Sequence, residues 1–412
     1  MKKFTVAAGM AAALMLGTSA FATDLEVTHW WTSGGEAAAV AEFAKAFDAT
    51  GNKWIDGGIA GSADVARPII LSRIQGGQPM DASMLNTGRD AEELIRAGLM
   101  TDLTELSNAE GWDNIINSRA FASCKVDGKV YCVPVNIHST LWLWVNRKVF
   151  EDNGLAVPTN WNELVAAAPA LREKGILPLS LAGGFAVGMA MDNIAVGVAG
   201  LDEYLKVYRD KDEAAAAGPA WTAVFKSLDE LRNLIEPAEM MPTHEWAQAV
   251  AQVINGQAAA NIMGDWAQGE FAVAGKVAGV DYDCFPGLGV NPVVNISGDS
   301  FFFPVVADEG KKAAQLELAK TLVSPDVQVA FNLKKGSMPI RQDIDLSAAN
   351  DCMKKGLALL ADEATVMPSN DQLITQDIQT QIQDLQNEFF ADRSLTVEDA
   401  QARFAEIIAS AD

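Results

Sequence analysis

A pair of adjacent tryptophans opens the first polar loop of the chain. Trp30 and Trp31 follow an extended run at 25–28 and precede the turn residues 32–35 and Glu36. Because successive side chains of a strand face opposite sides, the two indoles cannot both enter one core. We therefore expect at least one indole to offer its flat apolar face to a ligand, with the Glu36 carboxylate accepting hydrogen bonds beside it. The alternative is that both tryptophans pack within the protein.

Similar side chains stand at the ends of other extended segments. In an open α/β sheet, ligands collect at the carboxyl ends of the strands, so the loops that follow strands are the candidate binding loops. A pyranose ring has apolar C–H faces and a rim of hydroxyl groups, which aromatic rings and a surrounding set of carboxylates, amides and cations match. The loops supply this set in Asn86, Asp90, His138, Trp142, Trp144, Asp265, Trp266, Asp299, Lys334 and Lys335. The combination predicts a pocket for a neutral sugar.

Each of these residues also has a structural interpretation. A lone histidine such as His138 equally suits a hydrogen-bonded structural role. Trp142 and Trp144 share one face of an extended segment, so one can line a pocket while the other packs. Lys334 and Lys335 adjoin the end of a predicted helix, where cations are favoured in any case. Only the whole set, gathered at segment ends, indicates carbohydrate binding.

Alternating strands and helices must hold these loops in place. Extended runs at 25–28 and 82–85 alternate with helical patterns, one of which starts at Arg67-Pro68. Asn160, with Glu163 three residues later, marks a further helix start, and an apolar run at 258–263 leads into Gly264-Asp265-Trp266. The alternation predicts an α/β fold with sheets of the parallel type.

The first 22 residues have the layout of a secretory signal peptide. Lys2 and Lys3 precede an apolar stretch from Phe4 to Leu16, which is too short to span a bilayer, and the stretch leads to Ala20-Phe21-Ala22. We expect cleavage after Ala22 and release of a soluble protein into the periplasm. The residue directly after the cleavage point is Thr23 and not a cysteine, which disfavours a lipid-anchored form.

Length and charge limit the architecture and the partners. One hydrophobic core serves roughly 250 to 300 residues, so two lobes are expected for a chain of 412. The absence of a long linker indicates short crossings between the lobes, and hence a hinge. Acidic residues number 54 against 31 basic ones, and the net charge of −23 disfavours nucleic acid and anionic membranes as partners.

Four cysteines allow three pairings in an oxidising compartment. Cys124 and Cys132 flank Asp127-Gly128, a hairpin turn signal. A three-residue loop at 127–129 would place these cysteines opposite each other, whereas a two-residue loop would put them on opposite faces. We expect Cys124 to pair with Cys132 and Cys284 with Cys352. No cysteine spacing suits a structural zinc site, and we expect no metal and no cofactor.

Taken together, several segments resemble the solute-binding proteins of carbohydrate ABC importers, in particular the periplasmic glucose- and mannose-type sugar-binding proteins. The resemblance covers essentially the whole mature chain and is carried by the segments 29–36, 133–138, 142–146, 157–161, 264–266 and 335–341. It implies a two-lobe, type II periplasmic-binding-protein fold, with a mixed sheet flanked by helices in each lobe. Such a protein closes on a sugar between its lobes and delivers it to a membrane permease, and it is not an enzyme.

The resemblance also implies how the chain divides and where the sugar binds. We expect lobe 1 to contain residues 23–136 and about 285–335, and lobe 2 to contain about 137–284 and 336–412. By position, Trp30, Trp31 and Glu36 meet the sugar, and Asp265, Trp266, Asp299 and Lys334 or Lys335 are further cleft contacts. The loop 86–89 departs from the pattern, because glucose binders present a basic residue there and only Arg89 is at hand. The resemblance therefore favours a hexose such as glucose as the ligand without identifying the sugar.

The expected partners are the sugar and an inner-membrane ABC permease, which requires both lobe tips to be free and so favours a monomer. A chemoreceptor that binds the closed form stays open as a further partner.

Three alternatives to a monosaccharide-binding protein remain: a binder of a disaccharide, a binder that holds a zwitterionic osmolyte in an aromatic cage, and a secreted glycoside hydrolase. A hydrolase needs two carboxyl groups about 5 to 10 Å apart across the scissile bond, a distance that a sequence does not give.

Overall fold

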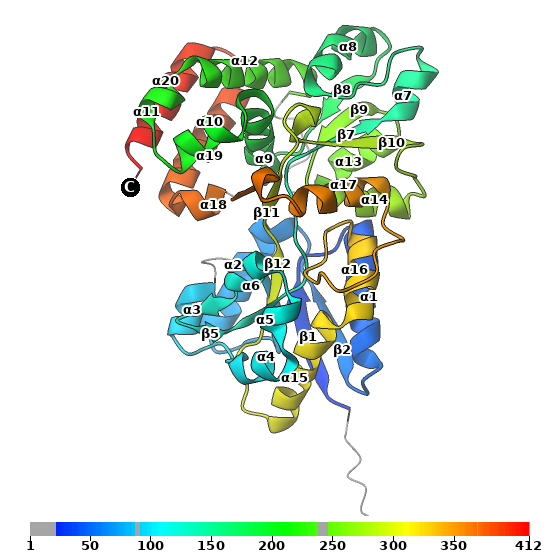
Figure 1. Ribbon diagram of the computed structural model, residues 1–412, viewed down its shortest axis with the longest axis vertical. Helices are drawn as coiled ribbons and strands as arrows, with labels where there is room; N and C mark the ends of the chain where they lie inside the picture. The colour runs from blue at the N-terminus through cyan, green and yellow to red at the C-terminus, as the bar shows by residue number, and fades with distance from the viewer. Residues whose placement is uncertain (1–21, 87–90, 238–245, 369, 412) are drawn as a thin grey trace, which may run out of the picture.

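The computed structural model describes residues 22–86, 91–237, 246–368 and 370–411, and the chain forms two lobes, each built around one sheet (Figure 1). Nearly all of the expected signal peptide lies outside the described residues. Among the described residues, no helix combines the length and the apolar character that crossing a membrane requires.

Lobe 1 surrounds a five-stranded sheet of order β2-β1-β3-β12-β6. The three strands β1, β2 and β3 run parallel, while β12 pairs antiparallel with β3 and β6. The strands are β1 (Asp24–His29), β2 (Lys53–Gly58), β3 (Ala82–Asn86), β6 (Cys132–Pro134) and β12 (Asp299–Phe302), with the separate hairpin β4 (Lys125–Val126) and β5 (Lys129–Val130). The helices are α1 (Gly34–Asp48), α2 (Ser62–Gln75), α3 (Glu92–Arg96), α4 (Thr104–Glu110), α5 (Trp112–Ile115), α6 (Ser118–Ala122), α15 (Glu309–Val323) and α16 (Pro325–Lys335).

Lobe 2 surrounds a four-stranded sheet of order β10-β7-β9-β8, in which β8 and β9 are parallel. Its strands are β7 (Trp142–Asn146), β8 (Leu177–Ser180), β9 (Ala258–Ile262) and β10 (Tyr282–Pro286), and a small ladder joins β11 (Val294–Ile296) to β13 (Val366–Pro368). The helices are α7 (Arg147–Asp152), α8 (Trp161–Glu173), α9 (Phe185–Ile194), α10 (Leu201–Tyr208), α11 (Glu213–Ala216), α12 (Pro219–Leu234), α13 (Trp246–Ile254), α14 (Ala267–Val273), α17 (Asp351–Leu360), α18 (Asn370–Leu373), α19 (Gln376–Ala391) and α20 (Val397–Ala409).

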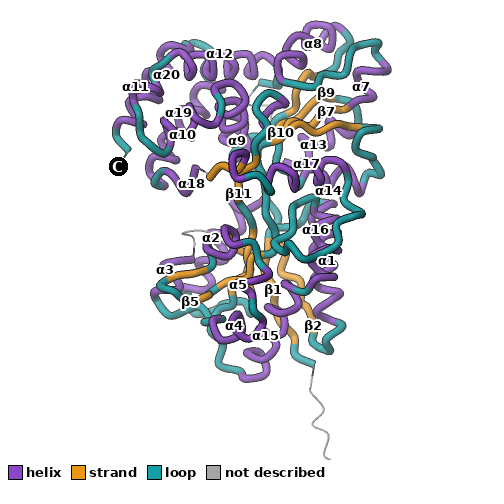
Figure 2. Tube along the Cα trace, viewed as in Figure 1, coloured by secondary structure: helices purple, strands orange, loops and turns teal. Residues whose placement is uncertain are grey.

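The chain passes between the two sheets in three segments, 135–141, 287–298 and 336–350, the second of which contains β11 (Figure 2). These crossing segments also pair with one another, because Ile137 bridges Met338 and His138 bridges Ser297. The second crossing begins after Pro286, the last residue of β10. Residues on the crossing segments therefore lie between the lobes.

Two helix starts test the sequence reasoning. The Asn160 side chain accepts a hydrogen bond from the Glu163 N–H and caps α8, as predicted. The predicted start at Arg67-Pro68 is wrong, because α2 begins at Ser62 and Pro68 lies inside it. The missing Pro68 N–H costs this helix one hydrogen bond, but the buried stripe of Ala66, Ile70 and Ile74 holds α2 on the lobe regardless.

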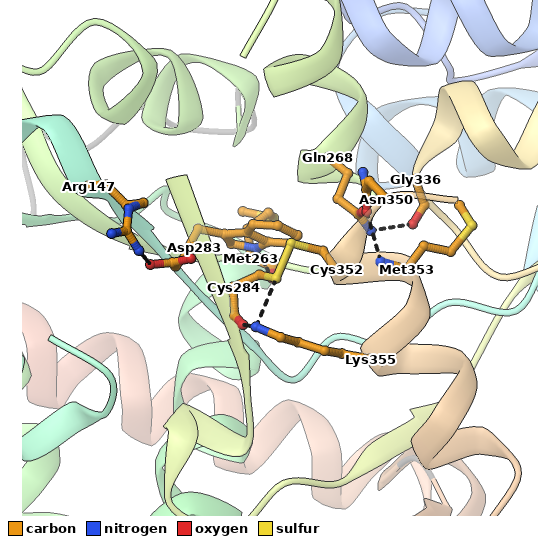
Figure 3. Close-up of a disulfide and its surroundings, with 11 residues drawn as sticks. Arg147, Met263, Gln268, Asp283, Cys284, Gly336, Asn350, Cys352, Met353 and Lys355 are labelled. Carbon is orange, nitrogen blue, oxygen red and sulfur yellow. Dashed lines mark hydrogen bonds and ion pairs between the residues drawn. A yellow bond between two sulfur atoms is a disulfide. The ribbon is translucent and has the colours of Figure 1, made fainter. Parts of the chain in front are cut away.

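Both predicted disulfides form: Cys124 with Cys132 and Cys284 with Cys352, with Cα–Cα distances of 5.0 and 5.9 Å. Of the two turn lengths considered, the structure has the two-residue one, because Val126 pairs with Lys129 and leaves Asp127-Gly128 as the turn, both with positive φ. Cys132 still reaches Cys124, since the hairpin ends at Val130 and Cys132 has entered β6. The second disulfide ties β10 to α17 beside Lys355 (Figure 3).

Candidate functional site

Three sequence-predicted residues, His138, Asp265 and Asp299, meet between the lobes, and together with Asn136 they form what we call the hinge cluster. His138 Nδ1 lies 2.6 Å from Asp265 Oδ1, and His138 Nε2 lies 2.9 Å from Asp299 Oδ2. The Asn136 amide donates to Asp299 Oδ2 at 3.0 Å, and its oxygen accepts from the Asp299 N–H at 2.8 Å. His138 lies on the first crossing segment, Asp299 begins β12 of lobe 1, and Asp265 follows β9 of lobe 2. The cluster therefore links both lobes to the hinge.

The hinge cluster is buried, and its charges act strongly on one another. His138, Asp265 and Asp299 are 5 %, 1 % and 3 % exposed. Burial by itself lowers the pKa of His138, but the Asp265 and Asp299 carboxylates outweigh it and hold that pKa above its ordinary value. Burial likewise favours a raised pKa for Asp299, but the hydrogen bond from His138 and the nearby Lys335 charge lower it.

A second buried pair, Glu36 with Lys335, lies next to the hinge cluster. Lys335 Nζ donates to Glu36 Oε1 at 2.8 Å, and both side chains are almost fully buried. The same ammonium lies 5.7 Å from the ring centroid of Trp31 in lobe 1 and 5.7 Å from that of Trp266 in lobe 2. Trp266 in turn meets the His138 ring edge to face at 4.9 Å. Lys335 thus joins aromatic rings from both lobes.

The structure buries both members of the N-terminal tryptophan pair. Trp31 packs against Phe43, Phe301 and Phe331 and is 1 % exposed, which makes it part of the core of lobe 1. Trp30 is 7 % exposed. The alternation argument fails here because β1 ends at His29, so neither tryptophan belongs to the strand.

Other predicted site residues lie apart from this group or outside the description. Trp142 and Trp144 stack on each other in the sheet of lobe 2, with centroids 5.7 Å apart, and both are buried. Lys334 is half exposed and pairs with Glu42, whereas the buried Lys335 pairs with Glu36. The backbone of Asn86 pairs with Asp299, which brings the end of β3 to the hinge cluster. Asp90, like Arg89, lies outside the described residues.

Sequence reasoning missed several polar partners of this group. Asn136 was a visible candidate, since it ends the extended segment that contains β6, and the loop rule could have found it. The Ser139 N–H donates to Asp265 Oδ2 at 2.9 Å. Such a backbone contact cannot be predicted from residue type. Among the described residues, no three metal-binding side chains are arranged to hold an ion.

Comparisons with known proteins agree with this architecture. The model of the family described as bacterial extracellular solute-binding protein matches residues 31–329. A "probable sugar-binding periplasmic protein" of Rhizobium meliloti is 34 % identical over 368 residues, which cover 89 % of this chain and 88 % of that protein. A protein of the same description in Brucella suis is 35 % identical over 337 residues, or 81 % of this chain and 79 % of that one.

Solved structures share the fold at low identity. A chitin oligosaccharide binding protein superposes with a TM-score of 0.74 at 20 % identity, covering 94 % of this chain and 98 % of that chain. A bacterial solute receptor described as preferring β-D-galactopyranose gives a TM-score of 0.74 at 20 % identity, covering 93 % and 98 %. These likenesses confirm the expected two-lobe, type II fold.

Proposed function

Because the chain belongs to the family of bacterial extracellular solute-binding proteins, we propose that it captures a neutral sugar in the periplasm and delivers it to an ABC importer. Like its relatives, the protein is a binding protein and not an enzyme. Its relatives in Rhizobium meliloti and Brucella suis are named as sugar-binding and periplasmic, which supports both the ligand class and the compartment. A hexose is the favoured sugar.

The observation that carries the proposal is the buried polar group between the lobes. Hydroxyl groups need both donors and acceptors, and the hinge cluster with Glu36 and Lys335 offers carboxylates, an imidazole and an ammonium within one region. Trp30 and Trp266 are the indoles that we propose for stacking on the sugar, since Trp31 is enclosed by its own lobe.

The charges of this group favour a neutral ligand over an acidic one. Three carboxylates, those of Glu36, Asp265 and Asp299, stand against Lys335 and at most one further positive charge on His138. Each of these two cations already has a carboxylate partner. A uronic acid or sugar phosphate would add another buried negative charge with no unpaired cation among these residues to receive it. We therefore propose a neutral sugar.

A thermal-shift panel tests the proposal. The mature protein is heated with D-glucose, D-mannose, D-galactose, D-xylose, maltose, D-glucuronate and glycine betaine in turn. A ligand at 100 times its dissociation constant adds about 2.7 kcal/mol of stability, which gives a clear shift. We expect a shift with a neutral sugar, which is recovered unchanged after incubation, and none with glucuronate. A shift with glycine betaine alone, or release of a smaller sugar, would contradict the proposal.

A further inference from the structure

The two lobes touch backbone to backbone beside the hinge cluster. Gly35, in the first turn of α1, faces Gly269 in α14 of the other lobe. A Cβ on Gly35 would lie 2.4 Å from the Gly269 carbonyl carbon and 2.7 Å from its Cα. Such distances are far below van der Waals contact, and a backbone has no rotamer by which to move away. Only glycine at position 35 permits this approach.

The C-terminal end of α16 takes part in the same contact. A Cβ on Gly269 would lie 2.9 Å from the Lys334 carbonyl oxygen, and one on Gly336 would lie 2.5 Å from the Gln268 Cβ. Gln268 Nε2 donates to the Gly336 carbonyl oxygen at 2.6 Å (Figure 3). The first turn of α14 is therefore fitted against two helices of lobe 1, α1 and α16.

The first turn of α1 receives its hydrogen-bond cap from the opposite lobe. Ser33, at the N-cap position, makes no side-chain cap and instead donates its hydroxyl to Glu36 Oε2 at 3.1 Å. The Gly35 N–H donates to Glu270 Oε1 of lobe 2 at 2.7 Å. A carboxylate at this end of a helix also interacts favourably with the helix dipole. Separation of the lobes would leave this N–H without its carboxylate.

We propose that this interlobe seam, made by Gly35, Gln268, Gly269, Glu270 and Gly336, latches the closed form and sets the sugar affinity without touching the sugar. The inference rests on the proposed function. A sugar held between lobes binds to the closed form, so its apparent affinity scales with the population of that form. A substitution that disturbs only the closed form therefore weakens binding while each lobe stays folded.

Two neighbouring glycines provide the decisive test. Gly35→Ala places its Cβ against the Gly269 backbone, whereas a Cβ on Gly34 comes no closer than 3.4 Å, an ordinary contact. Wild type and both variants are titrated calorimetrically with D-glucose, D-mannose, D-galactose and D-xylose. We expect Gly35→Ala to bind the sugar that wild type binds at least about tenfold more weakly, as overpacking predicts, and Gly34→Ala to stay within about twofold of wild type.

The titrations distinguish a failure of the seam proposal from a failure of the proposed function. Equal affinity of Gly35→Ala and wild type would overturn the seam and leave the proposed function intact. If wild type bound none of these sugars, the proposed function would fail. Small-angle scattering of the unliganded proteins would then decide about the seam, because Gly35→Ala must be more extended than Gly34→Ala and equal profiles would refute it.

Glu270→Gln tests the electrostatic part of the seam. The amide oxygen still accepts from the Gly35 N–H, but the charge at the α1 N-terminus is lost, and we expect about fivefold weaker sugar binding at low salt. The difference from wild type should shrink in high salt, because the charge–dipole attraction is screened. Glu230→Gln, on the exposed face of α12, makes the same change in net charge and should bind as wild type does. A salt-independent loss in Glu270→Gln would contradict the dipole argument.

Discussion

The lobes of this protein are joined in two different ways at neighbouring places. The hinge cluster joins them through buried charges, with His138 between Asp265 of lobe 2 and Asp299 of lobe 1. The seam joins them through glycine backbone at Gly35 and Gly269, where no side chain fits. A charged network responds to protonation and to loss of a partner, whereas a backbone contact responds to volume. The same closure thus depends on two properties that can be changed independently.

The largest effect is expected from breaking the hinge cluster. Asp265→Asn removes a buried charge that accepts from His138 and from the Ser139 N–H, and breaking a buried pair in this way costs about 3 kcal/mol of unfolding free energy. Urea denaturation measures the loss. Asp113→Asn is the control, because Asp113 is 62 % exposed and its pair with Lys125 should contribute less than about 1 kcal/mol. Similar losses in the two variants would show that the cluster is no more coupled than a surface pair.

A smaller effect is expected from filling the seam at Gly336. Ala at this position must adopt a positive φ of 84° and must also displace Gln268, so we expect a loss of about 2 to 3 kcal/mol in unfolding free energy. Gly98→Ala shares the positive φ, at 73°, but meets nothing within 4 Å. This control should lose only the backbone term of about 1 kcal/mol. If the two variants lost the same amount, the contact with Gln268 would carry no cost.

The loop-after-strand rule anticipated Asp265, which follows β9. It does not account for Asp299, which begins β12 and reaches the carboxyl end of β3 because the two strands are antiparallel. It did not anticipate the seam. Gly35 and Glu270 are 235 positions apart, and no local pattern in the sequence relates them. The burial of Trp31 inside lobe 1 could not be predicted either, because two of the three phenylalanines that pack against it, Phe301 and Phe331, come from β12 and α16.

The two junctions should also differ in their response to pH. The pKa of His138 is raised above 6.5 by Asp265 and Asp299, with Lys335 the nearby cation. The stability gained from the charged imidazole is therefore complete below about pH 6.5 and is lost as the pH rises through the raised pKa. Unfolding free energies from about pH 6 to about pH 9 should fall more steeply in wild type and in Gly35→Ala than in His138→Gln. Parallel curves for all three proteins would exclude His138 as the titrating group.

The smallest effect is expected from replacing Lys334, an exposed lysine next to the buried Lys335. Lys334 is 49 % exposed and pairs with Glu42 of its own lobe, so Lys334→Gln should change the unfolding free energy by less than about 1 kcal/mol and leave sugar affinity within about twofold. Lys335→Gln leaves the buried Glu36 without its cation and removes the ammonium between Trp31 and Trp266. It should therefore lower both quantities well beyond that range. Calorimetry and urea denaturation of the two variants compare a surface charge with an interlobe charge at adjacent positions. Equal behaviour would mean that the sugar is bound without help from Lys335.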